Sequence, residues 1–235
     1  RHTGDAFMKA VVERAHESSV PTVIHLDHGA DLDQMIWAVR TGFTSVMLDG
    51  SMLRFDENVD LTRKACEIAH AVGLSVEGEL GTIGSTDTEA EYGSATIIYT
   101  VPEDAVRFVE ETGVDSLAIA IGTSHGIYPT SMKPELKLDL LGEIAAAVSV
   151  PLVLHGGSNN PDDEIGQAAR SGINKINISS DIKVAYHDEM RRVLADAAVR
   201  EPNTIQPPSV AAMKRTAEHK IRLFGSDHKA ALYGA

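Results

Sequence analysis

Short runs of β-branched and aliphatic residues recur along the chain, and longer stretches with mixed polarity separate them. Runs of this kind, bounded by Gly, Pro or polar residues, predict strands that are buried on both faces. Six such strands are predicted, at residues 21–27, 44–49, 74–79, 116–121, 150–155 and 174–178.

The stretches between these runs carry apolar residues at helical spacing, for example over residues 61–72. Pro102 and Pro161 each open such a stretch, and glycines close four of them, at Gly42, Gly73, Gly113 and Gly172. Strands that alternate with helices are joined by right-handed parallel crossovers, which indicates an α/β barrel or a doubly wound open sheet. No linker divides the chain, so we expect a single domain over residues 1–235.

The composition limits the classes of function. Hydrophobic residues make up 43% of the chain and charged residues 23%, which is typical of a compact globular protein. A net charge of −13 argues against nucleic acid as a partner. Cys66 is the single cysteine, so a disulfide framework and a thiolate zinc cluster are excluded. We find no apolar run that would span a bilayer and no signal-peptide pattern, so we expect a cytoplasmic protein without membrane contact.

Polar and ionisable residues stand at the carboxyl ends of the predicted strands. They occur at residues 25–28, 49–51, 77–79, 155–158 and 177–181, and a further polar stretch follows the fourth strand at 122–126. In parallel α/β folds these strand ends share one rim, so residues far apart in the sequence converge there. We therefore expect the chemistry at this rim.

Three histidines, His28, His125 and His155, lie at strand ends or just beyond them. Neutral imidazoles that converge from separate strands and leave one coordination position open are what a catalytic Zn²⁺ site needs. A single histidine on a strand is more often a hydrogen-bonded core residue, but three at equivalent strand ends favour a metal site. Six further histidines are interpreted as surface or packing residues: His2, His16, His70, His187, His219 and His228.

Asp27 precedes His28, and strict strand alternation would point the two side chains to opposite faces. Gly29 makes a bend plausible at this point, so Asp27 is a candidate general acid/base beside a metal bound to His28. The alternative role as a helix cap is weaker, because Asp31 and Asp33 are better placed for capping.

Two turns could wrap an anion with backbone N–H groups, the Gly156-Gly157-Ser158 turn and the Ser179-Ser180 turn. They follow the last two strands, where barrels commonly bind phosphate. Residues 84–95 are polar and without periodicity, which fits either a mobile lid or an ordinary surface loop. Several other residues are interpreted as structural: Trp37, Phe43, Phe108 and Phe224 as core aromatics and Cys66 as a small buried hydrophobe. The basic residues Lys214, Arg215, Lys220 and Arg222 are interpreted as a solvated helix face, with a cation for a phosphate in a neighbouring subunit as the alternative.

These motifs resemble those of the zinc-dependent class II ketose-bisphosphate aldolases, which include fructose- and tagatose-bisphosphate aldolases. The resemblance extends from about His25 to Ser226 and consists of six motifs in order: HLDHG (25–29), SVMLDGS (45–51), VEGELG (76–81), AIGTSHG (120–126), LVLHGGS (152–158) and KINISSD (175–181). It implies a TIM (β/α)8 barrel.

The resemblance also implies roles for individual residues. His28, His125 and His155 would bind the catalytic Zn²⁺, and Asp27 would be the proton donor. Asp49 and Glu79 match positions that hold a second or displaced metal. Substrate and phosphate positions of the family fall on Gly126, Gly156, Gly157, Ser158, Asn177, Ile178, Ser179 and Ser180. The family often uses a monovalent cation, Na⁺ or K⁺, near the phosphate.

The chain departs from the family pattern in three places, of which the least consequential is Asn159-Asn160 in place of the commoner pair of a glycine and a hydrophobic residue after Ser158. Its six predicted strands correspond to the third through eighth of a barrel, so we expect the first one or two βα units to be missing and the chain to be N-terminally incomplete. The family's lid motif Gly-Gly-x-Glu is altered, with Ser85 in place of a glycine and Asp87 in place of the glutamate. The lid acid/base is therefore either Asp87 or Glu89.

The expected activity is reversible cleavage of a ketose 1,6-bisphosphate, foremost fructose 1,6-bisphosphate, to dihydroxyacetone phosphate and glyceraldehyde 3-phosphate. Tagatose 1,6-bisphosphate is an alternative substrate. Three other functions stay open, namely a Schiff-base aldolase that uses Lys175, a metal-binding barrel subunit without activity, and a zinc hydrolase. The resemblance favours a homodimer or homotetramer.

Overall fold

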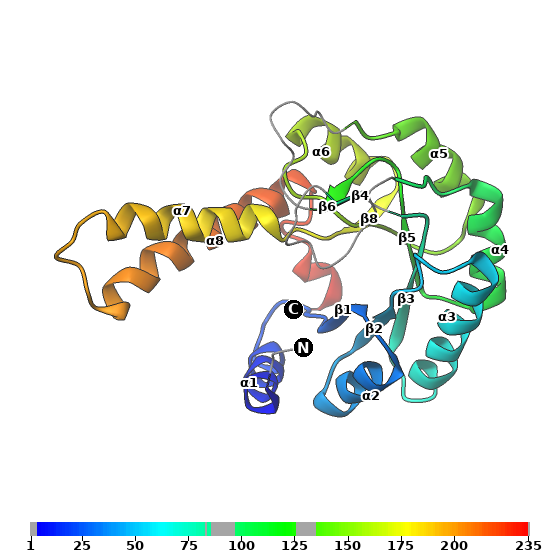
Figure 1. Cartoon of the computed structure of the whole chain (residues 1–235), viewed down its shortest axis with the longest axis horizontal. Helices are drawn as coiled ribbons and strands as arrows, with labels where there is room; N and C mark the ends of the chain where they lie inside the picture. Colours follow the sequence, from blue (N-terminus) through cyan, green and yellow to red (C-terminus); the bar gives the residue numbers. More distant parts are fainter. Residues whose placement is uncertain (1–3, 83, 86–96, 126–134, 235) are drawn as a thin grey trace.

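The computed structural model describes residues 4–82, 84–85, 97–125 and 135–234. Strands and helices alternate along most of the chain (Figure 1). The strands are β1 (His25–Gly29), β2 (Ser45–Leu48), β3 (Ser75–Leu80), β4 (Gly84–Ser85), β5 (Ser116–Ile119), β6 (Ser124–His125), β7 (Leu152–Leu154) and β8 (Ile173–Ile176). The helices are α1 (Asp5–His16), α2 (Leu32–Thr41), α3 (Phe55–His70), α4 (Pro102–Thr112), α5 (Leu138–Ala147), α6 (Asp162–Arg170), α7 (Ser180–Leu194) and α8 (Pro202–Leu223), followed by the 3₁₀ turn η1 (Ala230–Tyr233).

Six strands form one parallel sheet in the order β1-β2-β3-β5-β7-β8, which is the order of the chain. The sheet curves into an arc, and α2, α3, α4, α5 and α6 cover its outer side (Figure 1). The architecture is therefore an α/β half-barrel in which the carboxyl ends of the six parallel strands lie on one rim. All six predicted strands are present, and the two-residue strands β4 and β6 pair separately with each other.

The strand bounds differ most for β1, which begins at His25 rather than at residue 21. Pro21 has no N–H to donate to a ladder, which fits a later start of this strand.

Two helix signals behave as predicted. Asp31 caps α2 by accepting a hydrogen bond from Gln34 N, and Gly42 ends that helix in a left-handed conformation, φ 96°. The helix cap is thus Asp31, and Asp27 belongs to the strand.

The two faces of the sheet differ in chemistry. On the outer face Val46 and Leu48 pack with Met35 of α2 in the main hydrophobic core. Strand alternation turns the intervening residues inward, so that Glu77 and Glu79 of β3 share the inner face. Both glutamates are almost completely buried. Acidic side chains on the inner face of a sheet whose outer face is apolar mark this interior as functional rather than purely structural.

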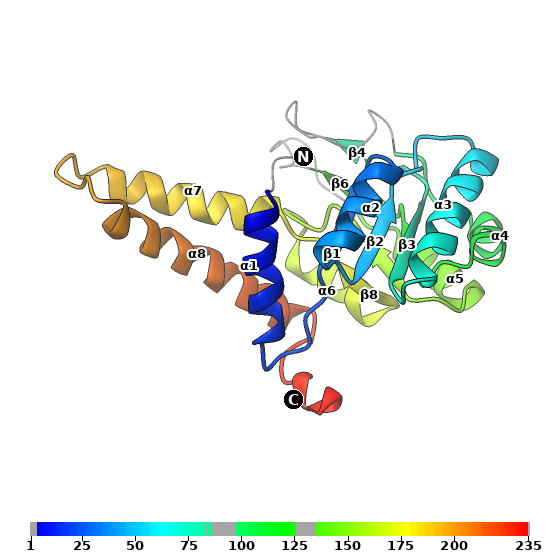
Figure 2. The same ribbon diagram turned by 90° about the horizontal axis from the view of Figure 1, so that it is seen from below.

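Helices α7 and α8 form an antiparallel hairpin that projects from one end of the molecule (Figure 2). Its base is tied to the barrel by Lys220, whose Nζ lies 3.3 Å from Asp162 Oδ1 and 3.1 Å from Asp181 Oδ2. Lys220 is buried, so the prediction that it belongs to a solvated basic face was wrong, because these two carboxylates converge on it from α6 and α7. Lys214 and Arg215 are exposed as expected.

Among the helices that the structure describes, none has both the length and the apolar composition needed to cross a membrane.

Candidate metal and aldol site

A β-bulge near the end of β1 brings Asp27 and His28 to the same site. Leu26 pairs with Val46 and Gly29 with Leu48, so two residues of β1 stand opposite the single residue Met47. His28 adopts a left-handed conformation with φ 46°. The predicted bend therefore occurs at His28 itself, one residue before Gly29, and it removes the alternation that would have separated the two side chains.

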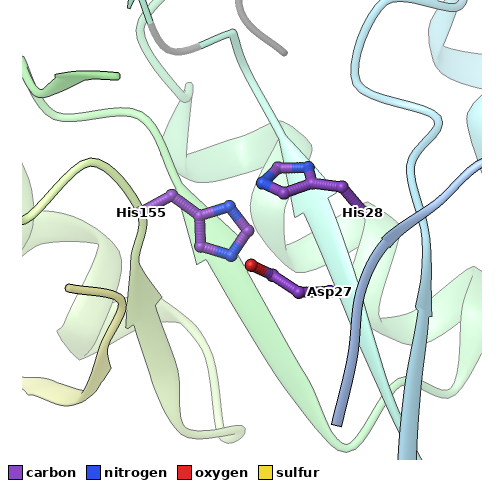
Figure 3. A group of neighbouring side chains, drawn as sticks. All are labelled: Asp27, His28 and His155. Atoms are coloured by element: carbon purple, nitrogen blue, oxygen red, sulfur yellow. The ribbon is translucent and has the colours of Figure 1, made fainter. Parts of the chain in front are cut away.

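His155 follows β7 directly and approaches this pair across the inner face of the curved sheet. The side chains of Asp27, His28 and His155 point toward one another (Figure 3), and their ligand atoms lie within 4.8 Å of each other. The two imidazole rings are edge to face, with centroids 4.7 Å apart. Residues separated by more than 120 positions in the sequence thus converge at the carboxyl ends of parallel strands, as the sequence predicted.

Asp49 orients the His28 ring. Its Oδ2 lies 2.8 Å from His28 Nδ1, and its Oδ1 accepts hydrogen bonds from Ser51 N and Ser51 Oγ. Burial disfavours the carboxylate, but the hydrogen bonds from His28 and Ser51 outweigh this effect and lower the pKa of Asp49 to about 2. For His28, burial is opposed by Asp49 and Glu79, and the net effect raises the pKa of the ring. Asp49 is therefore an ionised partner of His28.

Glu79 contributes a buried carboxylate between the two histidines. Its Oε2 lies 3.8 Å from His28 Nδ1 and 3.7 Å from His155 Nδ1. Burial raises the pKa of Glu79 to about 7. Within the part of the chain that the structure describes, Glu79 Oε2 has no hydrogen-bond partner. A buried carboxylate oxygen without a partner is costly, and a cation would relieve that cost.

Glu77 forms a hydrogen bond with the His155 ring, a contact that the sequence analysis did not identify. Glu77 Oε1 accepts a hydrogen bond from His155 Nε2 at 2.8 Å, and Glu77 Oε2 lies 2.8 Å from Lys175 Nζ and 3.8 Å from His25 Nε2. Burial opposes ionisation of Glu77, but His155 and Lys175 prevail and lower its pKa to about 2. The period of two that puts Glu77 on the same face as Glu79 was a signal that could have revealed it.

The two turns after β7 and β8 pack against each other. Ser158 Oγ accepts hydrogen bonds from Ser179 N and Asp181 N at the start of α7, and Gly157 N donates to Asn177 O. A Cβ on Gly157 would lie 2.5 Å from Ile176 Cγ2, so this position requires glycine. The turns are thus locked together.

The other predicted substrate residues lie in or beside these turns. Gly156 has φ 65°, and its carbonyl accepts a hydrogen bond from Asn160 Nδ2. Ile178 packs against the hydrophobic core, and Ser180 is the first residue of α7. Asn177 connects this region to the cluster of Asp27, His28 and His155, since its Nδ2 donates to Asp27 Oδ1 at 3.0 Å. The two edges of the half-barrel are therefore bridged at the site.

Some predicted site residues lie outside the described part of the chain. These are the lid candidates Asp87 and Glu89 and the substrate candidate Gly126. For His125 only the backbone is described, in β6, where it pairs with Ser85.

The residues present fit a divalent metal. Two imidazoles and a buried carboxylate form a nitrogen and oxygen donor set of the kind that Zn²⁺ accepts. Asp49 on His28 and Glu77 on His155 supply the carboxylate–histidine pairs that usually orient zinc ligands. Glu79 Oε2, which has no hydrogen-bond partner among the described residues, is the observation that most directly favours a cation in this place.

Comparisons with known proteins agree with this chemistry. Residues 1–229 match the family described as "Fructose-bisphosphate aldolase class-II". A sulfofructosephosphate aldolase of Alkalicoccus urumqiensis is 39% identical over 96% of this chain and 79% of its own length. A fructose-bisphosphate aldolase of Staphylococcus epidermidis is 40% identical over 90% of this chain and 73% of its own length.

Solved structures also resemble the fold of this chain. The YdjI aldolase of Escherichia coli K12 superimposes with a TM-score of 0.81 at 35% identity, covering 96% of this chain and 77% of that one. Members of this family act on phosphorylated sugars and are generally zinc-dependent. The chain belongs to the class II fructose-bisphosphate aldolase family and is an enzyme of the carbon–carbon lyase class.

Proposed function

We propose that this enzyme reversibly cleaves fructose 1,6-bisphosphate to dihydroxyacetone phosphate and glyceraldehyde 3-phosphate. The observation that carries the proposal is the convergence of Asp27, His28 and His155 beside the buried Glu79 carboxylate. The fructose-bisphosphate aldolase among the relatives supports the choice of sugar. The tagatose isomer is an alternative substrate, and the sulfofructosephosphate aldolase among the relatives adds a sulfofructose phosphate as another.

The six strands would be the third to eighth strands of a TIM (β/α)8 barrel. The half-barrel is parallel, its strands follow chain order, and its chemistry lies at the carboxyl rim, as in such barrels. This interpretation also accounts for the position of α2 to α6 on the outer side of the sheet (Figure 1).

His28, His155 and His125 would hold the catalytic Zn²⁺, with Asp49 and Glu79 available for a second or displaced position. When bound, Zn²⁺ supplies a Lewis acid that polarises the ketone of the sugar. A monovalent cation near the phosphate stays an expectation from the family resemblance.

Asp27 would move the proton of the reacting hydroxyl. It accepts the proton from the C4 hydroxyl as the carbon–carbon bond breaks, and it returns the proton to the aldehyde oxygen in the condensation direction. Asn177 holds Asp27 Oδ1, so the other carboxylate oxygen is the one that exchanges the proton. A lid carboxylate, Asp87 or Glu89, would exchange the proton on carbon.

The phosphate of the substrate would lie at the turns after β7 and β8. The N–H groups of Gly157, Ser179 and Asp181 are engaged within the turns, so the phosphate would take those of Gly156, Ser158 and Ser180. The start of α7 adds the partial positive charge of a helix N-terminus, which an otherwise acidic protein needs in order to hold a bisphosphate. Gly156, Gly157, Ser158, Asn177, Ile178, Ser179 and Ser180 would form this cradle together with Gly126.

The Schiff-base alternative is disfavoured by the partner of Lys175. An amine must be neutral to attack a ketone, whereas Lys175 Nζ is 2.8 Å from the ionised Glu77 carboxylate. The amine is therefore engaged in an ion pair and is not available to attack a ketone.

The test is a cleavage assay with fructose 1,6-bisphosphate, tagatose 1,6-bisphosphate and sulfofructose phosphate, before and after chelation. We expect activity to disappear with the chelator and to return with Zn²⁺. Asp27→Ala should lower kcat about 10²- to 10⁴-fold and still bind Zn²⁺. Asp31→Ala is the matched control, because this carboxylate only caps α2 and its loss should cost about 1 kcal/mol of stability without affecting kcat.

Three results would contradict the proposal. Activity that survives chelation and is trapped by borohydride would identify a Schiff-base enzyme. Zinc binding without cleavage of any of the three sugars would indicate another phosphorylated ketose or a non-catalytic subunit. Faster hydrolysis of an ester than cleavage of a sugar would indicate a zinc hydrolase.

A further inference from the structure

The His155 ring is held by one oxygen of a buried carboxylate. Glu77 and His155 are 2% and 1% exposed, and the hydrogen bond between Glu77 Oε1 and His155 Nε2 measures 2.8 Å. A carboxylate accepts hydrogen bonds and does not donate them, so His155 Nε2 must carry the proton in this contact. The partner of the ring therefore determines its tautomer.

The other oxygen of Glu77 is committed to Lys175. The distance from Glu77 Oε2 to Lys175 Nζ is 2.8 Å, and an ammonium group only donates hydrogen bonds. Each oxygen of this carboxylate thus has its own partner, one an ammonium group and the other an imidazole ring.

The remaining nitrogen of His155 faces the proposed metal. His155 Nδ1 lies 3.7 Å from Glu79 Oε2, and the ring stands edge to face with His28. With the proton on Nε2, the lone pair of the ring is on Nδ1, which is the form that a metal ion requires.

We infer that Glu77, set by Lys175, is a positioning residue that keeps His155 in the tautomer whose Nδ1 binds the metal. This inference rests on the metal site of the proposed function. It assigns a role to a buried glutamate and to Lys175, the lysine considered above as a Schiff-base nucleophile.

The decisive variant is Glu77→Gln. The Lys175 ammonium will attract the amide oxygen, which leaves the amide NH₂ facing His155 Nε2. The ring must then accept at Nε2 and carry its proton on Nδ1, where it blocks the metal. We expect zinc affinity, measured by competition with a chelator, to fall about 10- to 100-fold.

Lys175→Met supplies a test that a merely structural role would not pass. In Glu77→Gln/Lys175→Met the amide can rotate and present its oxygen to His155, so zinc affinity should recover relative to Glu77→Gln alone. If the two residues only supported packing, the double variant would bind zinc more weakly than either single variant.

Asp115→Asn is the matched control. Asp115 forms another carboxylate–histidine pair, 2.8 Å from His70 Nε2, at the opposite end of β3. Its loss removes the same kind of contact away from the rim, and zinc affinity should stay within about twofold of wild type.

A second readout is the imidazole tautomer in metal-free protein, followed by ¹⁵N NMR and assigned with His155→Asn. We expect a proton on Nε2 in the wild type and on Nδ1 in Glu77→Gln. Wild-type protein with its proton on Nδ1, or Glu77→Gln with unchanged tautomer and affinity, would overturn the inference. If wild-type protein binds no zinc, the proposed metal site is wrong, and the tautomer of His155 still tests the role of Glu77. If Glu77→Gln does not fold, the tautomer of His155 in the wild type remains the test.

Discussion

At the scale of single residues, the site depends on backbone conformations that ordinary strands do not have. His28 sits at φ 46°, in the left-handed region, at a cost on the order of 1 kcal/mol. Asp49 and the bulge in β1 hold it there. As a result, the side chains of two adjacent residues, the acid/base candidate Asp27 and the metal-ligand candidate His28, lie at the same site.

The buried thiol of Cys66 leads to a prediction at this scale. Burial, with further contributions from Asp115 and Glu67, raises the pKa of Cys66 to about 12. We expect native protein at pH 8 to react with a thiol reagent on the order of 100-fold more slowly than unfolded protein. Cys66→Ala gives the background, and reaction of native protein at the unfolded rate would contradict the prediction.

The same shift sets the sign of a pH effect. Below pH 9 the thiol is protonated in both the folded and the unfolded chain, so it does not affect the pH dependence of stability. Between pH 9 and about 12 only the unfolded chain loses this proton, so Cys66 makes stability fall as the pH rises.

At the scale of elements, β3 links the core to the chemistry. Its inward residues are Glu77 and Glu79, and on its outer face Gly78 lets Phe108 of α4 approach the backbone closely. A Cβ on Gly78 would lie 2.7 Å from Phe108 Cε1 and 3.0 Å from Val114 Cγ1. The strand that presents both carboxylates is thus held in place by packing at the glycine between them.

Gly78→Ala tests that packing. We expect a loss of about 1 to 3 kcal/mol in the free energy of unfolding, because Phe108 is fully buried and has little room to move. Gly142→Ala in α5 is the control with opposite sign. Outside its own helix, no atom of the described residues lies within 4 Å of the added methyl, and the helix should gain about 0.5 to 1 kcal/mol. Denaturant unfolding measures both, and equal stabilities would refute the packing argument.

At the scale of the whole molecule, the projecting α7–α8 hairpin is the feature that the half-barrel does not explain (Figure 2). None of the side chains of α7 is buried, and Val184, Leu194 and Val210 of the hairpin are exposed. Apolar side chains on a projecting arm are typical of an association surface.

We therefore expect a homodimer or homotetramer, with the hairpin contributing to the contact. Light scattering on the eluted protein should give at least twice the mass of 25.2 kDa. The double variant Leu194→Glu/Val210→Glu should shift the protein toward monomer, because the oligomer would have to bury the new charges in its contact. Lys214→Glu changes the charge of an exposed residue and should leave the mass unchanged. A monomeric wild type would contradict this expectation.

Much of the site could be predicted from the sequence. Buried strands have their own residue pattern, and parallel strands bring their carboxyl ends to one rim, so Asp27, His28 and His155 were expected to meet there. The resemblance to a known family named the same residues. The helix cap at Asp31 and the helix end at Gly42 followed from local backbone chemistry, which depends on a few neighbouring residues.

Other features depend on contacts between distant segments. The partners of Glu77 come from β8 and from the end of β7, and those of Lys220 come from α6 and α7. No local pattern specifies such partners, because they are set by how the sheet curves and how the helices pack. The sequence by itself determined the elements and the rim where the chemistry lies. Only the tertiary structure decided which charges meet, since opposite charges and hydrogen-bonding groups act through space and not along the chain.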